Sequence, residues 1–434
     1  MQSQQRKPAR VVSDVLADGT LIESVQADAQ APTSLVIARG GEIEVTSKWT
    51  HEGVQHVPVP AAHNLIKHRA IKLPGLPTEY RSAEKLGGRI ERYASRYLAL
   101  SPEFLKIAST YVLLSWVYDA FNELPYLRFR GDYGSGKSRA LTVFGSILYK
   151  GFFASGASTV SPIFHTLDTF KGALILDEAD FRFTDEKAEL VKILNNGNVK
   201  GFPVLRTHVT AAKEFEPRAF SVYGPKIVGM RGSYDDRALE SRFLTEEMSG
   251  RALPADIPIS LPEAQEEEAL ALRSKLLMYR IRERGRVAID PSLVDPSLEP
   301  RMNQILLPLL SITPTAETRS AILSYAARIQ TSVVSDRASS TEGQLLHVIA
   351  YTVQSDAKGI LPLQHIVDAF TSRFGSEYDR PITNRYLGGI LRNRLGLPLY
   401  KTNGVVAVSL KDRARLDVLL KRYGIGENAG TNSG

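Results

Sequence analysis

The sequence predicts an α/β fold in which a parallel β-sheet is covered by helices. A glycine-rich pattern at residues 131–138 lies between an apolar run of strand length and an apolar run of helix length. A second apolar run, at residues 173–176, ends in two acidic residues. Short apolar runs then alternate with helical patterns as far as about residue 248, which is the order expected of parallel strands joined by crossover helices.

The first motif reads Gly-Asp-Tyr-Gly-Ser-Gly-Lys-Ser and fits the P-loop pattern G-x-x-x-x-G-K-[ST] at every fixed position. In such loops, backbone N–H groups surround phosphates, the lysine reaches the β- and γ-phosphates, and the hydroxyl binds Mg²⁺. Residues 127–129 predict the strand before the loop, and residues 139–149 predict the helix after it, whose N-terminus favours an anion. The expected nucleotide contacts are Gly131, Asp132, Tyr133, Gly134, Ser135, Gly136, Lys137, Ser138 and Arg139. The alternative is a chance turn rich in glycine and serine.

The acidic pair Asp177-Glu178 follows an apolar run that suits a central strand buried on both faces. Because this strand would end beside the P-loop, we expect Asp177 to hold Mg²⁺ together with Ser138. Glu178 is then expected to polarise the attacking water. The alternative is an ordinary strand end with two solvated acids. No acceptor motif of a nucleotide kinase is visible, so the pair favours hydrolysis of ATP that drives mechanical work.

Composition sets broad limits on the chain. Its 434 residues, 43% of them hydrophobic and 23% charged, are typical of a soluble globular protein with more than one domain. The absence of cysteine excludes disulfides and thiolate metal sites and favours a reducing, cytoplasmic setting. No signal peptide is visible, and the longest apolar run, residues 107–118, is too short to span a bilayer, so no membrane association is expected. The net charge of +7 mildly favours a polyanionic partner.

Residues 1–78 predict a small β-rich accessory domain whose first ten residues are disordered. Residues 34–38 and 42–46 flank two glycines, which is a hairpin pattern. Residues 56–60 are interrupted by prolines and predict at most an edge strand. The role of this domain is not evident from the sequence.

Residues 79–252 predict the core of the α/β domain, which opens with a helix over residues 82–98 and a second helix from Pro102. Residues 253–338 predict a helical lid. The lid has an acidic start and a basic stretch at residues 273–286, and this order matches the helix dipole. We therefore interpret these charges as a solvated helix face.

Residues 339–434 predict a winged-helix domain. Helical patterns begin at Thr341, Pro362 and Thr383, and two apolar runs flank Asn403-Gly404, which is a strong hairpin signal. From residue 340 onward there are 12 basic and 8 acidic residues, so this region holds +4 of the chain's +7. This excess suits duplex DNA. The expected DNA contacts are Arg385, Arg392, Arg394 and Lys401. The alternative is a winged helix that contacts protein.

Together these motifs resemble the AAA+ ATPases of the helicase-like group found in phages, plasmids and other mobile elements, which is related in plan to the minichromosome-maintenance and superfamily 3 helicases. The resemblance covers residues 98–332 and rests on the order and spacing of five stretches. They are the P-loop, residues 161–167 with 174–180, residues 193–198, residues 223–229 with 239–243, and residues 300–310.

The resemblance implies further roles. Members of the group form rings, so a hexamer that uses ATP and Mg²⁺ is expected. Arg242 resembles the arginine finger that completes a neighbouring subunit's nucleotide site, with Arg237 as a nearby competitor. Arg301 resembles the sensor-2 arginine of the lid and is expected to contact nucleotide. The sensor-1 position departs from the pattern, because residues 229–233 lack the expected asparagine, and no residue is assigned there.

Related ring helicases also project a hairpin into the central pore, and residues 201–220 fit such a hairpin. Arg206, His208 and Lys213 would then contact the phosphates of single-stranded DNA. The alternative is a surface hairpin with no role in a pore.

The expected function is a ring-forming motor acting on DNA, as the replicative helicase of a mobile element. Two other functions stay open. A DNA-binding ATPase switch, such as a helicase loader or a transposition regulator, would hydrolyse ATP without unwinding. A protein remodeller would not need nucleic acid at all.

Overall fold

The computed structural model describes residues 8–179, 185–209, 213–250, 253–355, 360–402, 404–409 and 413–425. Residues 1–7, which belong to the segment expected to be disordered, lie outside this range. So do Asp180, the end of the acidic stretch, and Asn403 of the expected wing turn.

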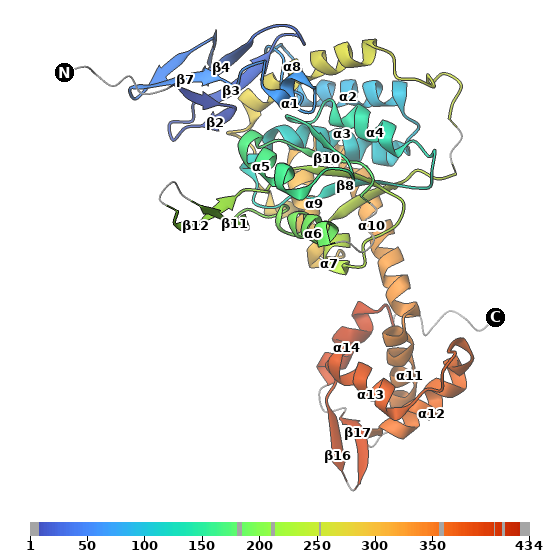
Figure 1. Cartoon of the computed structure of the whole chain (residues 1–434). Helices are drawn as coiled ribbons and strands as arrows, with labels where there is room; N and C mark the ends of the chain where they lie inside the picture. Colours follow the sequence, from blue (N-terminus) through green and yellow to red (C-terminus); the bar gives the residue numbers. More distant parts are fainter. Residues whose placement is uncertain are drawn as a thin grey trace. The chain divides into compact units, whose positions relative to one another are not determined.

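The chain forms two compact units, residues 1–325 and 326–434, which we call the first and second unit (Figure 1). The boundary between them falls inside the long helix α10 (Ala316–Ser339). The finer four-part division stays a prediction.

A five-stranded parallel sheet forms the centre of the first unit. In spatial order its strands are β14 (Phe243–Glu247), β8 (Tyr126–Arg130), β13 (Lys226–Met230), β10 (Leu174–Leu176) and β9 (Phe152–Ala154). From β8 the chain runs to the far edge, returns through β10 and β13, and then crosses to β14. The strand order therefore reverses at β8, and open parallel sheets bind ligands at the carboxyl end of such a switch point.

Helices surround this sheet (Figure 1). They are α1 (Asn64–Lys67), α2 (Ala83–Tyr97), α3 (Pro102–Val117), α4 (Lys137–Gly145), α5 (Val160–Phe170), α6 (Asp185–Asn196), α7 (Arg237–Glu240), α8 (Ala264–Glu283) and α9 (Pro300–Ile312), with short 3-10 turns at η1 (Tyr118–Ala120) and η2 (Pro291–Leu293). The predicted starts of α2 and α3 are confirmed. Ser82 and Ser101 each precede a helix and accept a hydrogen bond from a backbone N–H of its first turn.

Helix α4 is shorter than predicted, because it ends at Gly145 rather than near residue 149. A Cβ atom on Gly145 would lie 2.7 Å from the Phe153 ring and 2.8 Å from Ile175, so β9 and β10 approach the end of the helix closely. Beyond it, the carbonyl of Ile147 accepts a hydrogen bond from the Trp116 side chain at 3.0 Å. Tertiary contacts therefore replace the last predicted turn.

The N-terminal residues form two small sheets. One contains β2 (Ser13–Val15), β3 (Leu21–Gln26), β4 (Thr33–Arg39) and β5 (Glu42–Thr46), and the other contains β1 (Ala9–Val11), β7 (Val54–Pro58) and β6 (Trp49–His51). The predicted hairpin is confirmed, since β4 and β5 pair antiparallel.

Two expectations about this region are wrong. Residues 9 and 10, expected to be disordered, belong to β1. Strand β7, expected to be at most an edge strand, is the middle strand of its sheet. Strand β6 pairs with residues 54–56 of β7, and β1 pairs with residues 56–58. Pro58 therefore has a paired strand on one side only, so its missing N–H costs the sheet little.

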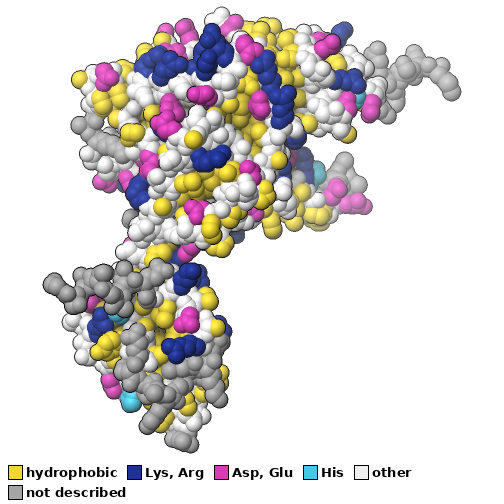
Figure 2. Space-filling view, turned by 180° about the vertical axis from the view of Figure 1, so that it is seen from behind, with side chains coloured by type: hydrophobic (Ala, Val, Ile, Leu, Met, Phe, Trp, Pro, Cys, Tyr) yellow, Lys and Arg dark blue, Asp and Glu magenta, His cyan; other side chains and the backbone are white. Residues whose placement is uncertain are grey.

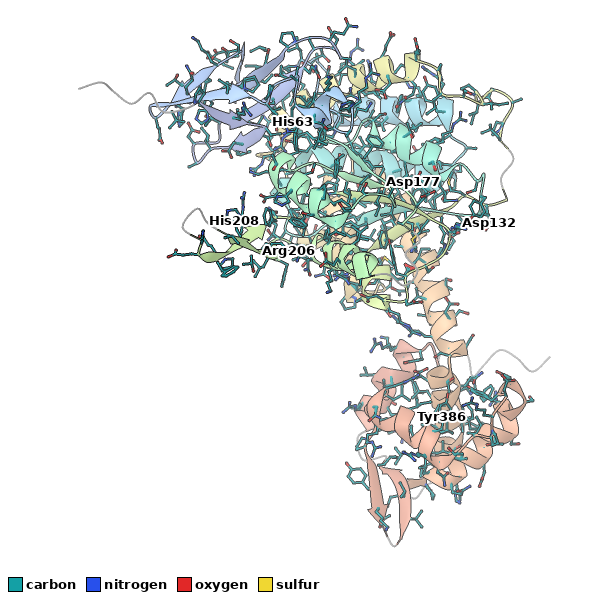
Figure 3. All side chains as sticks on the ribbon, viewed as in Figure 1. His63, Asp132, Asp177, Arg206, His208 and Tyr386 are labelled. Atoms are coloured by element: carbon teal, nitrogen blue, oxygen red, sulfur yellow. The ribbon has the colours of Figure 1, made fainter. Side chains whose placement is uncertain are left out.

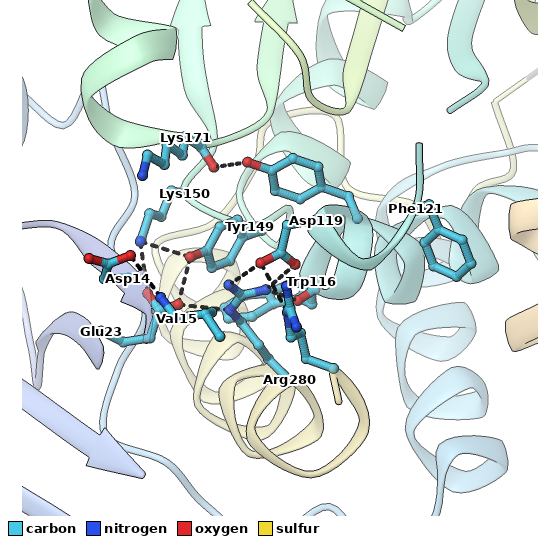
Figure 4. Close-up of polar contacts among 12 residues, drawn as sticks. Asp14, Val15, Glu23, Trp116, Asp119, Phe121, Tyr149, Lys150, Lys171 and Arg280 are labelled. Atoms are coloured by element: carbon cyan, nitrogen blue, oxygen red, sulfur yellow. Dashed lines mark hydrogen bonds and ion pairs between the residues drawn. The ribbon is translucent and has the colours of Figure 1, made fainter. Parts of the chain in front are cut away.

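The charge run of α8 is also not simply a solvated face. Arg273 and Arg280 are buried, with exposed fractions of 6% and 2%. They lie seven residues apart on one face of α8, a helix that packs against α2 and α3. Arg273 donates a hydrogen bond to the carbonyl of Leu73 at 3.0 Å, and Arg280 binds the carboxylates of Glu23 and Asp119 (Figure 4). Two of the basic residues in this stretch, Arg273 and Arg280, therefore face the interior rather than solvent.

In its described residues, the second unit contains the end of α10, four further helices and a three-stranded antiparallel sheet, and three of those helices correspond to the predicted ones. These three helices are α11 (Thr341–Ser355), α12 (Leu363–Phe374) and α13 (Asn384–Asn393), with the 3-10 turn η3 (Gly375–Glu377), and the strands are β15 (Ile360–Pro362), β17 (Val405–Ser409) and β16 (Leu399–Thr402). The three predicted helices and two predicted strands are present. Strand β15 and helix α14 (Arg413–Arg422) were not predicted.

Candidate nucleotide and nucleic-acid sites

The P-loop pattern forms the turn between the carboxyl end of β8 and the N-terminus of α4. Gly134 and Gly136 have φ angles of 73° and 90°, in the left-handed region that favours glycine. The ammonium of Lys137 donates hydrogen bonds to the carbonyls of Gly131 and Asp132, both at 2.6 Å. This charge therefore lies against the loop, at the start of α4 where the first helical N–H groups are free, and the combination fits an anion.

The chain segment that follows β14 contacts the start of the P-loop through Ser249. The N–H of Asp132 donates a hydrogen bond to Ser249 Oγ at 3.0 Å. A Cβ atom on Gly131 would lie 2.8 Å from Ser249 Oγ and 2.8 Å from Ser135 Oγ, so a larger residue would push the loop away from this support. The first glycine of the motif is thus explained by close contact.

The remaining predicted loop residues have different surroundings. Tyr133 is 81% exposed, and the guanidinium of Arg231 lies 4.3 Å from its ring centre and donates a hydrogen bond to its hydroxyl. Arg231 directly follows β13, where the sequence left the sensor-1 role unassigned. Arg139 donates a hydrogen bond to the carbonyl of Ile259 at 2.6 Å, so the chain segment before α8 holds its side chain. Ser138 is exposed in the first turn of α4.

Asp177 and Glu178 follow β10, and the neighbouring β13 separates them from the strand that carries the P-loop. The β13 residue beside them is Gly229, where a Cβ atom would lie 3.1 Å from Asp177 Oδ1 and 2.9 Å from Leu141 of α4. The Asp177 carboxylate therefore leans across bare backbone toward the P-loop helix. Figure 3 shows Asp177 and Asp132 on the same side of the unit.

Glu178 is exposed and has a φ angle of 55°, which is unusual for a residue with a side chain. Its N–H donates a hydrogen bond to Asp177 Oδ1 at 2.9 Å. The N–H of the next residue, Ala179, donates to the carbonyl of Gly229 at 2.9 Å. The chain after β10 thus turns sharply and presents the Glu178 side chain near Gly156 of the β9–α5 loop.

Within the described ranges, no three or more histidine, aspartate or glutamate side chains form a cluster that could hold a metal ion. The Asp177 carboxylate and the Ser138 hydroxyl still fit Mg²⁺, which binds few protein ligands and keeps its remaining sites for water and phosphate oxygens.

Arg242 and Arg301 lie near each other at the amino ends of the strands, opposite the P-loop, which lies at their carboxyl ends. Arg242 directly precedes β14, and its carbonyl accepts a hydrogen bond from the N–H of Tyr126, the first residue of β8, at 2.8 Å. The five residues of β8 separate this edge from the P-loop by roughly 15 Å. The structure thus places neither arginine at the P-loop of its own chain.

Both guanidinium groups are half-buried. Burial lowers the pKa of Arg242, and burial together with the charge of Arg242 lowers the pKa of Arg301. Arg242 donates a hydrogen bond to Asn195, while its Nε atom is buried without a partner among the described residues. Arg237, the competing finger, is exposed at the start of α7.

The predicted hairpin consists of β11 (Val204–Val209) and β12 (Phe215–Phe220), which pair antiparallel and extend from the first unit (Figures 1 and 3). Arg206 forms an ion pair with Glu189 at 3.1 Å, and its guanidinium lies 5.1 Å from the ring centre of Phe164. His208 and Lys213 are exposed. Arg206 is therefore held at the base of the hairpin, and the other two residues lie further out.

Sequence reasoning missed the two-faced character of this hairpin. Arg218 pairs across from Arg206, which adds a second cation to the polar face. Leu205, Val209 and Phe215 lie on the other face and are 62%, 53% and 79% exposed. The sequence does contain this information, because successive residues of a strand point to opposite faces and apolar and polar residues alternate along both strands.

In the second unit, Arg385 and Arg392 are exposed on α13, and Lys401 is exposed on β16. Arg394 follows α13 and forms an ion pair with Glu342 at 2.8 Å. The first three side chains thus face solvent, while the fourth already has a partner.

Two surface properties bear on partners. Among the described residues, no helix combines the length and apolar character needed to cross a bilayer. On the face seen in Figure 2, basic and acidic side chains are interspersed over the first unit.

No protein-family model and no curated protein sequence matches the chain. Solved structures do match at low identity. The C-terminal region of NrS-1 (apo, A form) is 11% identical over 89% of this chain and 96% of that chain, with a TM-score of 0.36. The active helicase Cch of SCCmec type IV is 11% identical over 95% and 82%, with a TM-score of 0.41. The ORC1 protein of Aeropyrum pernix in complex with DNA is 15% identical over 76% and 94%, with a TM-score of 0.22. TM-scores of this size do not establish a common fold.

Proposed function

We propose that this chain is a Mg²⁺-dependent ATPase of the AAA+ type that works as an oligomeric motor on DNA. One observation carries the proposal. The P-loop lies at the switch point of a parallel sheet, and the Asp177 carboxylate leans toward the helix that the loop begins.

The chain's own residues would then act as follows. Loop N–H groups and the Lys137 ammonium bind the phosphates, and the Ser138 hydroxyl and Asp177 hold Mg²⁺. Bound ATP supplies the γ-phosphoryl group that is transferred to water. Glu178 would accept a hydrogen bond from that water and take its proton, while the water oxygen bonds to the γ-phosphorus and the bond from that phosphorus to the leaving ADP oxygen breaks. The left-handed backbone at residue 178 supports this role, because it sets the direction in which the side chain leaves the end of β10.

The placement of the arginines supports a site shared between subunits. Arg242 and Arg301 lie at the amino ends of the strands, away from the P-loop of their own chain. A closed ring would carry this edge of one subunit to the P-loop of the next. Either Arg242 or the exposed Arg237 would then stabilise charge on the γ-phosphoryl group.

Two regions would contact nucleic acid. The hairpin β11–β12 offers His208, Lys213 and exposed apolar side chains to a single strand. The second unit, interpreted as a winged helix, offers Arg385 and Arg392 to a duplex. The finer proposal is a replicative helicase of a mobile element, and a DNA-dependent ATPase switch is the second candidate.

The test is the ATPase rate against protein concentration, with and without single-stranded DNA. We expect DNA to stimulate the wild type and the rate per subunit to rise with concentration. Lys137→Ala and Arg242→Ala should each be inactive and should partly restore activity when mixed, whereas Arg237→Ala should stay active. If Arg237→Ala is the inactive variant instead, the finger assignment moves to Arg237.

A rate that depends on neither concentration nor DNA would refute the ring motor and favour a protein remodeller. Unwinding of a forked duplex then separates the two DNA-dependent functions. A helicase unwinds it at the expense of ATP, and a switch with the same DNA-stimulated ATPase does not.

A further inference from the structure

Helix α13 carries two adjacent glycines in its interior, where glycine is less favourable than alanine. Packing explains the first. A Cβ atom on Gly388 would lie 3.2 Å from Leu399 and 3.3 Å from Leu363, so β16 and α12 approach the helix closely at this point.

Packing within the chain does not explain the second glycine. A Cβ atom on Gly389 would meet no described atom within 4 Å. Its φ angle is not positive, so the backbone conformation does not require glycine either. The open space at this position therefore leaves room for a partner to approach the helix backbone closely.

The side chains around Gly389 indicate the chemistry of that partner. Positions three and four residues away on a helix are its surface neighbours. Here they are Arg385, Tyr386, Arg392 and Asn393, all exposed. Helix α13 contains no acidic residue. Bare backbone is thus surrounded by two cations, an aromatic ring and an amide, a set that complements a phosphate chain.

We propose that the absence of a side chain at Gly389 lets the sugar–phosphate backbone of duplex DNA contact the backbone of α13, with Arg385 and Arg392 bound to phosphates on either side. This inference rests on the proposed DNA-binding function and names the residue that sets the closeness of the contact. The contact distance is set by the missing methyl group, so an alanine at this position separates the two backbones.

The chain offers a matched control. Gly88 is also an interior glycine with open space at its Cβ position, on α2. Its neighbours are of mixed charge, since Glu84 and Glu91 accompany Lys85 and Arg92. Gly88→Ala therefore changes helix propensity in the same way without altering a basic face.

The experiment uses the full chain, a fluorescein-labelled duplex DNA of mixed sequence, and thermal unfolding of each variant. We expect Gly389→Ala to unfold at the same or a higher temperature than the wild type and to bind the duplex about tenfold more weakly. Gly88→Ala should show the same thermal behaviour and bind the duplex as the wild type does.

Two results would overturn the inference. One is wild-type affinity in Gly389→Ala. The other is a lower unfolding temperature in Gly389→Ala, which would show that the chain's own fold needs the glycine. The double variant Arg385→Ala, Arg392→Ala separates this failure from failure of the proposed function. If that double variant also keeps wild-type affinity and salt dependence, the second unit does not bind duplex DNA by this face. If only the double variant loses affinity, the DNA face stands and the role of Gly389 is rejected.

Discussion

Glu178 combines a candidate catalytic role with a strained backbone. Its φ angle of 55° is left-handed, and such conformations cost of order 1 kcal/mol in a residue other than glycine. The strain accompanies the turn that places the carboxylate at the carboxyl edge of the sheet. Stability and activity therefore oppose each other at this position.

We predict that Glu178→Gly raises the unfolding temperature and abolishes ATP hydrolysis. Glu178→Gln should keep the strain and nucleotide binding but lower the hydrolysis rate by roughly 100-fold or more, because the amide cannot take a proton from water. Calorimetry and steady-state ATPase assays measure both effects. Lys171, with a φ angle of 51°, is the matched control, since Lys171→Gly should also raise the unfolding temperature but leave hydrolysis unchanged. Full activity in Glu178→Gln would reject the assignment.

Lys226 is a fully buried cation on β13, outside both candidate sites. Its ammonium donates hydrogen bonds to the carbonyls of Gly197, Val222 and Gly224 at 2.8 to 3.1 Å. Burial lowers the pKa of Lys226 to about 7. Between about pH 7 and the ordinary lysine pKa of 10.5, the unfolded chain holds a proton that the folded chain releases. The contribution of this group to stability therefore rises with pH in that window.

We predict that the urea midpoint of the wild type rises from pH 7 to pH 9 more steeply than that of Lys226→Met. Expressed as free energy of unfolding, the two pH slopes should differ by at most about 1.4 kcal/mol per pH unit, because one proton is involved. Lys192→Met, at an exposed lysine, should keep the wild-type slope. Equal slopes in the wild type and Lys226→Met would show that Lys226 stays protonated in the folded state.

At the scale of elements, the hairpin β11–β12 packs against α5 but still exposes several apolar side chains. One face carries Arg206 and Arg218, and the other exposes Leu205, Val209 and Phe215. Stacking on an exposed aromatic ring contributes about 1–3 kcal/mol per base in single-strand binding. Phe215 and the nearby Lys213 are therefore expected to matter more than Arg206, whose charge is already paired with Glu189.

We predict that Phe215→Ala and Lys213→Ala each weaken stimulation of the ATPase by single-stranded DNA and leave the basal rate unchanged. Arg206→Ala should have a smaller effect, and Glu189→Gln, which frees Arg206, should leave stimulation intact or increase it. The DNA concentration at half-maximal stimulation is the measured quantity. If Arg206→Ala has the largest effect, then the ion pair must open to bind DNA.

The limits of sequence-based prediction also belong to this scale. The P-loop, the acidic strand end and the hairpins could be predicted, because each depends on local residue types at fixed spacing. The end of α4 at Gly145 could not, since contacts from β9 and β10 fix it. The inward turn of Arg273 and Arg280 could not either, because a charge pattern does not show which carboxylates and carbonyls the fold brings near. The proximity of Arg242 and Arg301 likewise depends on topology.

At the scale of the whole first unit, a buried ionic network joins the N-terminal sheet to the rest of the unit (Figure 4). Glu23 of β3 is fully buried and binds Lys150, beyond α4, and Arg280 of α8, each at 2.7 Å. Tyr149 donates a hydrogen bond to the same carboxylate at 2.6 Å. Burial lowers the pKa of Lys150 to about 8, whereas the Arg280 and Arg284 cations hold the pKa of Asp119 well below its usual range. Three distant parts of the chain therefore share one set of charges.

We predict that residues 8–78 unfold together with the five-stranded sheet. Glu23→Gln should lower the free energy of unfolding of the first unit by about 3–5 kcal/mol, because it leaves two buried cations without their shared carboxylate. Adding Lys150→Met to Glu23→Gln should restore part of the loss, since the double variant removes one of those cations together with the charge that paired it. Glu79→Gln, which breaks the exposed pair of Glu79 with Arg282, should change stability little.

Urea unfolding, followed by near-ultraviolet circular dichroism and by hydrogen exchange of β3 and β4, measures these effects. A separate early transition confined to the N-terminal strands, with no shift of the main transition in Glu23→Gln, would contradict the coupling. If the coupling holds, the N-terminal sheets are a structural part of the candidate motor, and truncation before Tyr80 should abolish folding of the P-loop unit itself.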